Sequence, residues 1–116
     1  MKAKRRRTTP ARQPTQLELL GEGVDVWNEW RERHSDVKPA LSYATLRGSQ
    51  LRGVNLTYAN LSYADLSDAS LVGADLRFAN LTETNLNGAD LTSAKMVQFA
   101  VQNFIGMRRV GSDVRN

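Results

Sequence analysis

A leucine recurs at every fifth position through the second half of the chain, and this spacing dominates the pattern of apolar residues. The leucines are Leu41, Leu46, Leu51, Leu56, Leu61, Leu66, Leu71, Leu76, Leu81, Leu86 and Leu91, and Met96 and Val101 keep the same register. A period of five fits neither the 3.6-residue period of an α-helix nor the 2-residue period of a β-strand. The pattern indicates a square coil in which each five-residue unit forms one side.

Two other positions of the repeat are restricted as well. The residue two places before each leucine is small: Ala44, Ser49, Val54, Ala59, Ala64, Ala69, Ala74, Ala79, Thr84, Ala89 and Ala94. The residue directly before the leucine is mostly Asn or Asp: Asn55, Asn60, Asp65, Asp75, Asn80, Asn85 and Asp90. We therefore expect the leucine and the small residue to point inward, and the other three residues of each repeat to face outward.

Tandem units of the form Ala-(Asp/Asn)-Leu-x-x resemble the pentapeptide-repeat family. The closest units are Ala59-Asn60-Leu61, Ala64-Asp65-Leu66, Ala74-Asp75-Leu76, Ala79-Asn80-Leu81 and Ala89-Asp90-Leu91. The resemblance implies an all-β solenoid, a right-handed quadrilateral β-helix with four pentapeptides in each coil. The register holds for about 60 residues, which makes about three coils. Phe99 is large for an inward position, so we expect the regular coil to end near it.

Residues 16–34, before the repeats, are predicted to be an α-helical cap. Apolar residues fall at helical spacing on one face: Leu17, Leu20, Val24, Trp27 and Trp30. Charged residues occupy the rest: Glu18, Glu22, Asp25, Glu29, Arg31 and Glu32. Gly21 and Gly23 predict a break, and Pro39 is expected to turn the chain into the repeats. The segment Gly-Val-Asp-Val-Trp-Asn-Glu-Trp-Arg also resembles the one that often precedes the repeats in bacterial pentapeptide-repeat proteins.

The two tryptophans of this segment have two interpretations. They are expected to cover the open first coil near Leu41 and Leu46, and the alternative is a face that binds a partner. The predicted organisation is a disordered basic arm at 1–15, the helical cap at 16–38, the β-helix at 39–103 and a C-terminal cap or tail at 104–116.

Aromatic residues at the last position of their repeats are the candidate protein-binding residues: Tyr43, Tyr58, Tyr63 and Phe78. Residues twenty apart lie above one another in a four-sided coil, which predicts one ladder of Tyr43, Tyr63 and Glu83 and a second of Tyr58, Phe78 and Gln98. Stacked rings stabilise neighbouring coils as cross-strand pairs do. The two ladders belong to adjoining faces, so the alternative is one exposed aromatic strip suited to docking.

The net charge of +4 resides at the ends of the chain, while the repeats are close to neutral. Six bases without an acid make the N-terminal arm a candidate for binding polyanions: Lys2, Lys4, Arg5, Arg6, Arg7 and Arg12. A dense apolar run near the other end either closes the last coil or forms a homodimer. Its candidate self-association residues are Phe99, Phe104, Ile105 and Met107.

Few residues are suited to catalysis or to metal binding. Cysteine is absent and His34 is the only histidine, so no Ser/His/Asp arrangement is available in the repeats and we expect neither an enzyme nor a cofactor. An outward group of acids and amides could hold a cation, although such side chains more often bind turns: Asp65, Asp68, Asn85 and Asn87. No apolar run reaches the ~18 residues of a membrane span, and polar residues follow the basic N-terminus, so a cytoplasmic location is expected.

The sequence favours a non-enzymatic module for protein interaction or scaffolding, whose partner is another protein. Nonspecific binding of nucleic acid through the arm is the first alternative. The family resemblance supplies a second, because some long members mimic DNA and bind type II topoisomerases. The short, nearly neutral repeat region of this chain makes that alternative weaker. The chain is also compatible with being the capping part of a larger assembly.

Overall fold

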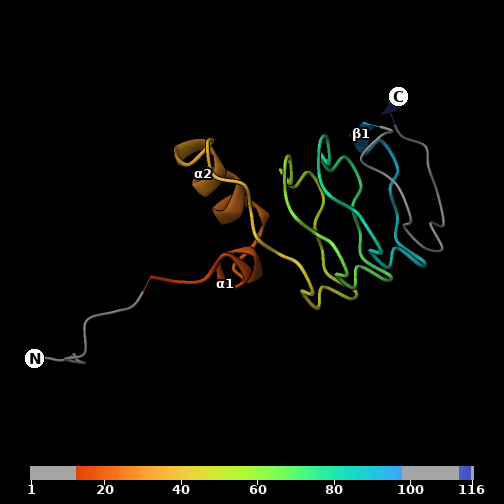
Figure 1. The fold of residues 1–116 in the computed structure, drawn as a ribbon, viewed down its shortest axis with the longest axis horizontal. Helices are drawn as coiled ribbons and strands as arrows, with labels where there is room; N and C mark the ends of the chain where they lie inside the picture. The colour runs from red at the N-terminus through yellow and green to blue at the C-terminus, as the bar shows by residue number, and fades with distance from the viewer. Residues whose placement is uncertain (1–12, 98–112, 116) are drawn as a thin grey trace, which may run out of the picture.

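The computed structural model describes residues 13–97 and the backbone of residues 113–115. Two short helices, α1 (Gln16–Gly21) and α2 (Val24–Arg33), lie at one end of a stack of coils. The coils begin at Pro39, and the strands β1 (Lys95–Val97) and β2 (Asp113–Arg115) follow at the far end (Figure 1). The described helices include none that is long and apolar enough to cross a membrane.

The coils are held together by parallel pairs of residues twenty apart in the sequence. The first pair is Ala40 with Asn60 and the last is Asp75 with Lys95. A coil of four five-residue sides, predicted from the leucine spacing, is therefore confirmed. Each side contributes a single bridging residue rather than a longer strand, because a turn interrupts the extended backbone every five residues.

We number the four faces from the start of the first coil, residues 39–58. The first face holds residues 39–43, 59–63 and 79–83, and the second holds 44–48, 64–68 and 84–88. The third face holds 49–53, 69–73 and 89–93, and the fourth holds 54–58, 74–78 and 94–97.

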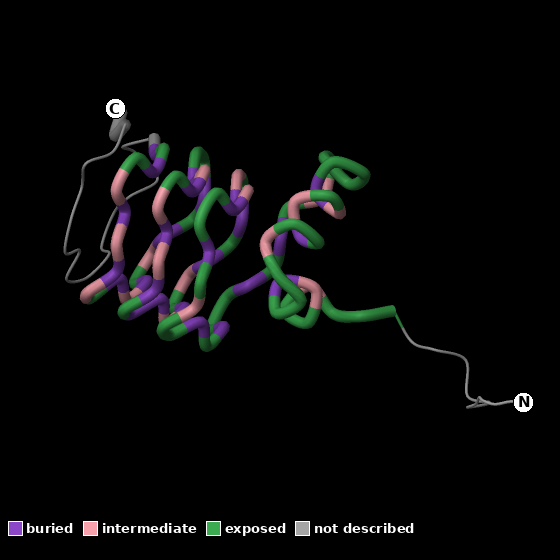
Figure 2. Tube along the Cα trace, turned by 180° about the vertical axis from the view of Figure 1, so that it is seen from behind, coloured by how far each residue is buried: buried purple, intermediate pink, exposed green. Residues whose placement is uncertain are grey.

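The interior of the solenoid is filled by the leucines and by the small residues that precede them. Every leucine from Leu41 to Leu91 is buried, and Met96 continues the column. Figure 2 shows this regularity as short buried segments that alternate with exposed ones around each coil. Thr84 takes a small inward position, where its hydroxyl donates to the carbonyl of Leu61 at 2.7 Å. The inward register predicted from the sequence is confirmed.

A tight turn ends each side, and its geometry explains the rest of the repeat. In the first coil the N–H of Ala44 donates to the carbonyl of Leu41 at 3.1 Å, and the residue between, Tyr43, has a φ of 62°. A positive φ at the third residue alone is the mark of a type II turn. The Asn or Asp before each leucine accepts the N–H two residues on, as Asn60 does from Ser62 at 3.0 Å. The side chain thus holds the backbone that enters the turn.

The helical segment breaks where its glycines predicted. Thr15 and Glu18 form a capping box at the start of α1, and Gly23, with a φ of 121°, precedes α2. Trp27 and Leu20 are buried, as expected, whereas Leu17 is 42% exposed because α1 directs Leu19 toward the core instead. These two helices pack against one another and against the first coil.

Pro39 was expected to turn the chain into the repeats, and it is itself part of the first coil. Its side chain is buried, and its carbonyl accepts the N–H of Asn60 at 2.8 Å. Pro39 thus fills the first inward small position. At the far end, β1 pairs in parallel with β2, and Lys95 faces Asp113. This separation is eighteen residues rather than twenty, so the five-residue register is not kept between these two strands.

Candidate protein-interaction surface

The four candidate aromatic residues form two stacked pairs. The rings of Tyr43 and Tyr63 lie 5.1 Å apart and are inclined by 7°, and those of Tyr58 and Phe78 lie 5.0 Å apart at 15°. Both predicted ladders are therefore confirmed over these pairs, while Gln98 falls outside the described residues. Because the rings stack along the solenoid axis, each pair presents its ring edges to the solvent.

The two pairs flank the first face of the solenoid. Tyr43 and Tyr63 end sides of this face, whereas Tyr58 and Phe78 end the sides of the fourth face that lead into it. The outward residues between the two corners are small and uncharged: Ala40, Ser42, Asn60, Ser62, Asn80 and Thr82. The structure thus places all four aromatic residues around one surface whose central positions are uncharged, and Glu83 ends the third side of this face.

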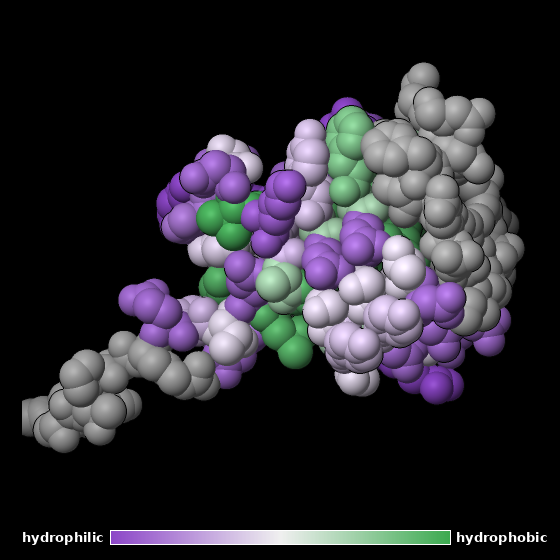
Figure 3. Space-filling view, viewed as in Figure 1, coloured by the Kyte–Doolittle hydropathy of each residue, from purple (hydrophilic) through white to green (hydrophobic). Residues whose placement is uncertain are grey.

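All four aromatic side chains remain open to solvent. Tyr43 is 72% exposed, and even Phe78, the least exposed of them, is 43% exposed. The coil surface is otherwise largely hydrophilic or intermediate in the view of Figure 3. Exposed apolar residues that gather at one place are unusual on a small protein and mark candidate contact sites.

A shallow depression of about 410 Å³ runs along the Tyr58 corner of the first face. It is lined by Lys38, Pro39, Ala40, Tyr58, Asn60, Phe78 and Asn80. The side-chain oxygens of Asn60 and Asn80 are occupied, because they accept backbone N–H groups at 3.0 Å. Their amide nitrogens bind no other group in the described part of the chain. They are therefore free to donate hydrogen bonds to a partner.

The aromatic residues adopt a backbone conformation that bulky side chains rarely take. Each has a φ between 61° and 65°, in the left-handed region. Other corners of the same coils carry Gly48, Gly53, Gly73, Gly88, Asp68, Glu83 or Ser93. Glycine enters this region without steric cost, and Asp does so more easily than an aromatic residue.

The other faces carry charges that are largely paired with one another. Arg77 binds both carboxylate oxygens of Asp75, at 2.8 and 2.7 Å, and Arg47 lies 3.6 Å from Asp68. Burial alone would raise the pKa of Asp75, but the hydrogen bonds and charge of Arg77 together hold it below its usual value. These faces therefore offer no continuous stripe of one sign within residues 39–97.

Asp65 and Asn85 bind turns, which the sequence analysis gave as the more frequent arrangement, and Asp68 lies near Arg47. Asp65 accepts the N–H and the hydroxyl of Ser67 at 3.0 and 2.6 Å, and Asn85 accepts the N–H of Asn87 at 2.9 Å. The hydroxyl and then the N–H of Ser67 lower the pKa of Asp65. Across the described segments, no group of three or more His, Asp or Glu side chains is placed to hold a metal ion.

The remaining candidate residues lie outside the described part of the chain. This applies to the polyanion-binding candidates Lys2, Lys4, Arg5, Arg6, Arg7 and Arg12, and to the self-association candidates Phe99, Phe104, Ile105 and Met107. Both interpretations stay predictions.

Sequence reasoning placed Trp27 on the first coil but missed the hydrogen bonds that α2 makes there, and the part that Asn28 and Arg31 have in them. The indole N–H of Trp27 donates to the carbonyl of Asn55 at 2.7 Å, and Asn28 binds the backbone on either side of Val54. Arg31 was expected on the charged face, but only 3% of it is exposed. Its guanidinium donates to the carbonyls of Val37 and Thr57 at 2.6 and 3.0 Å, and burial lowers its pKa.

This geometry defines the class of fold as a four-sided β-solenoid with helices that cover its N-terminal end. A family model described as pentapeptide repeats matches residues 40–71 and 69–98, with eight copies. The chain therefore belongs to the pentapeptide-repeat family, and the fold implied is a right-handed quadrilateral β-helix. No curated protein matches the chain.

Two solved structures from the cyanobacterium Nostoc PCC 7120 are similar to this chain. The pentapeptide repeat protein alr5209 is 27% identical, over 76% of this chain and 94% of its own, with a TM-score of 0.39. HetL, a pentapeptide repeat protein involved in the regulation of heterocyst differentiation, is also 27% identical, with a TM-score of 0.29. The match covers 66% of this chain and 46% of HetL.

Proposed function

We propose that the protein is a non-enzymatic interaction module whose first face and flanking aromatic corners bind a protein partner. The observation that carries this proposal is the set of four exposed aromatic residues at positive φ, gathered around one face whose central positions are uncharged. The solenoid serves as a rigid frame that fixes the distance between the two corners.

Energetics argue against a purely structural role for these aromatic residues. A bulky residue in the left-handed region costs about 1–2 kcal/mol, so each stacked pair carries that cost twice. Ring stacking contributes only about 0.5–1.5 kcal/mol for each pair beyond ordinary burial. Glycine or asparagine at the same corners would serve the turn at lower cost. The aromatic residues are therefore better explained by a contact with another molecule.

The surface between the corners suits a protein partner. Tyrosine is enriched among the residues that dominate binding energy at protein interfaces. The outward residues between the corners carry no charge, so covering them removes no ion from water, and the charged Glu83 and Lys38 lie at the margins of the face. Asn60 and Asn80 supply donors at the centre of the face, where the backbone carbonyls of a partner can accept them.

The test replaces all four aromatic residues by asparagine: Tyr43→Asn, Tyr58→Asn, Tyr63→Asn and Phe78→Asn. Asparagine tolerates positive φ, so circular dichroism and melting should show a folded variant. Wild type and variant are used to capture partners from native lysate under crosslinking, with quantitative mass spectrometry. A third-face variant, Val72→Ser with Thr92→Ser, is the matched control.

A partner that wild type and the third-face control retain, and that the asparagine variant loses at least tenfold, is the expected result. A partner retained equally by all three proteins would place binding elsewhere and overturn the proposal.

Polyanion binding through the N-terminal arm is a second proposal, carried by the six bases without an acid in residues 1–12. Contacts with phosphates alone would make affinity insensitive to base sequence and strongly dependent on salt. Fluorescence anisotropy of labelled DNA and RNA over a salt series, with and without residues 1–12, tests this. Binding that survives the deletion would show that the arm is not the site that binds polyanions.

A further inference from the structure

The first coil exposes backbone groups that every later coil uses for pairing. Between coils, Asn60 donates its N–H to the carbonyl of Pro39 and accepts the N–H of Leu41, both at 2.8 Å. The carbonyl of Ser62 accepts the N–H of Tyr43 at 2.9 Å. Each side of a coil thus offers one N–H and two carbonyls to the coil before it. The first coil has no coil before it.

On the fourth face, side chains of α2 replace the missing coil completely. Asn28 accepts the N–H of Asn55 at 2.8 Å, and Trp27 donates to the carbonyl of Asn55 at 2.7 Å. Arg31 donates to the carbonyl of Thr57 at 3.0 Å. On the first face, the side-chain oxygen of Gln16 accepts the N–H of Ala40.

On the second and third faces, the corresponding groups have no partner in the described part of the chain. They are the N–H and carbonyl of Thr45, the carbonyl of Arg47, the N–H and carbonyl of Gln50 and the carbonyl of Arg52. All four residues are exposed. An unpaired strand edge of this kind is a template for pairing with another chain.

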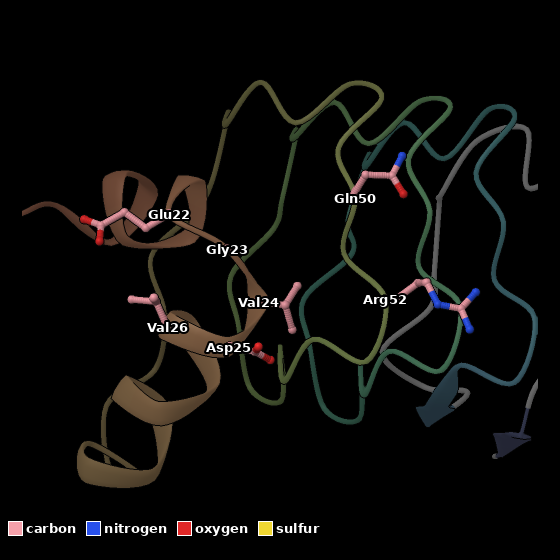
Figure 4. A pocket seen from close by; sticks show the side chains of 7 residues that line it. All are labelled: Glu22, Gly23, Val24, Asp25, Val26, Gln50 and Arg52. Atoms are coloured by element: carbon pink, nitrogen blue, oxygen red, sulfur yellow. The ribbon is translucent and has the colours of Figure 1, made fainter.

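A groove separates this open edge from the α1–α2 junction. One cavity of about 500 Å³ is lined by Glu22, Gly23, Val24, Asp25, Val26, Gln50 and Arg52. Figure 4 shows Gln50 and Arg52 on the coil, with the junction opposite and Val24 pointing toward the coil. A second cavity of about 500 Å³ shares Gly23 and Gln50 with the first, so the two are neighbours.

The second cavity has an apolar lining beneath the open edge. Its apolar side chains are Leu17, Leu20, Leu46 and Leu51. Leu17 is the residue that the helix leaves 42% exposed, although its position in the sequence predicted burial. Leu20, Leu46 and Leu51 are buried, so the groove combines unpaired backbone groups along one wall with the exposed side chain of Leu17.

We propose that this groove binds an extended peptide segment of a partner protein, which adds one more layer to the second and third faces. An extended backbone supplies acceptors for the N–H groups of Thr45 and Gln50 and donors for the open carbonyls, as in other cases of strand addition. The unpaired N–H and carbonyl groups are spaced along the chain like the groups that form hydrogen bonds between the later coils. The segment therefore follows the spacing of the pentapeptide pattern, with a glycine at the corner between the faces and a leucine that packs against Leu17.

This surface is separate from the aromatic corners, and the mode of binding differs. The aromatic corners present side chains, whereas the groove presents the backbone edge. The proposal does not depend on the function proposed above, and variants of the two surfaces are expected to act independently.

Proline substitutions distinguish an open edge from a paired one. Gln50→Pro and Thr45→Pro each remove an N–H that is unpaired, and proline is tolerated at strand edges. Each should leave the melting temperature within about 2 °C of wild type. Asn55→Pro is the matched control, because it removes an N–H that Asn28 binds, and it should lower the melting temperature clearly. Equal decreases in the melting temperature of all three variants would show that the N–H groups of Thr45 and Gln50 are paired in the folded protein. That result would overturn the proposal.

The binding probe is a fluorescein-labelled decapeptide of two Ala-Asn-Leu-Ser-Gly units, titrated against the full chain. Amide hydrogen exchange followed by NMR should show Thr45 and Gln50 exchanging rapidly in the free protein and protected when peptide is present. Affinity should fall at least tenfold for Gln50→Pro and for a peptide N-methylated at alternate amides. It should be unchanged for the four-asparagine variant. No protection of Thr45 and Gln50 at millimolar peptide would overturn the proposal, as would binding insensitive to N-methylation.

Discussion

The inner coils and the first coil meet the same hydrogen-bonding requirement in different ways. Between inner coils, the backbone groups that face a neighbouring coil pair with its backbone, and the bridged residues are twenty apart in the sequence. On the first coil, α2 supplies individual side chains, among them Trp27, Asn28 and Arg31. Backbone pairing between coils follows from the repeated backbone geometry, so the outward side chains can vary. The arrangement on the first coil depends on particular residues and covers only part of the edge.

The interior of the coils is where a single change is expected to have the largest effect. Leu71 is fully buried, with coils on both sides. Leu71→Asp removes about 3–5 kcal/mol by truncation and adds the cost of a buried carboxylate. A domain of this size has a stability of about 5–15 kcal/mol, so little folded protein should remain. Far-UV circular dichroism measures this, with Leu71→Met, which should cost less than about 1.5 kcal/mol, as the control. A folded Leu71→Asp protein would contradict the inward register.

The next largest effect is expected where the helices meet the first coil. Trp27 is fully buried and also donates to Asn55, so Trp27→Ala should lower the free energy of unfolding by about 3–5 kcal/mol. Trp27→Phe keeps most of the packing and removes the N–H, and it should cost less. Urea unfolding of both variants separates the two contributions. If the alanine variant is as stable as wild type, the helices do not stabilise the coils.

The difference between these two regions also explains what the sequence could predict. The leucine register, the number of coils and both aromatic ladders follow from a period of five, because each repeat has the same surroundings. Asn28 and Arg31 are polar residues of an amphipathic helix, and helical periodicity places such residues in solvent. Only the open backbone groups of Asn55 and Thr57 show why Asn28 contacts the first coil and why Arg31 is buried. The pairing of Lys95 with Asp113 departs from the repeat, so no periodicity predicts it.

A smaller effect is expected for the guanidinium contacts of α2. Arg31 donates to the carbonyls of Val37 and Thr57 through two different nitrogens, and no carboxylate is bound to it in the described residues. Lysine carries the charge but lacks the planar fork, so Arg31→Lys should lose one of these bonds and cost about 1–3 kcal/mol. Thermal unfolding measures the loss. Arg33→Lys, at an exposed position of the same helix, is the control and should be nearly neutral.

The smallest effect is expected in the pH dependence of the stability. The coils should show this dependence, whereas the contacts between α2 and the first coil should not. The contacts that α2 makes with the first coil use Trp27, Asn28 and Arg31, whereas the turn at Asp65 uses a carboxylate. Ser67 lowers the pKa of Asp65 in the folded protein. A lowered pKa stabilises the fold above the unfolded value of about 3.9, and this stability is lost as the pH falls through the folded value.

Asp65→Asn should therefore be less stable than wild type at pH 7, and the difference should shrink below about pH 4. Asparagine keeps an acceptor for Ser67, as Asn60 does for Ser62, so the turn itself should persist. Urea unfolding of both proteins from pH 7 to pH 3 gives the difference directly. Asn60→Asp, which keeps the N–H and the hydroxyl of Ser62 as donors, is the matched control and should gain a similar pH dependence. A difference between Asp65→Asn and wild type that stays constant over this range would show that the charge of Asp65 does not stabilise the coil.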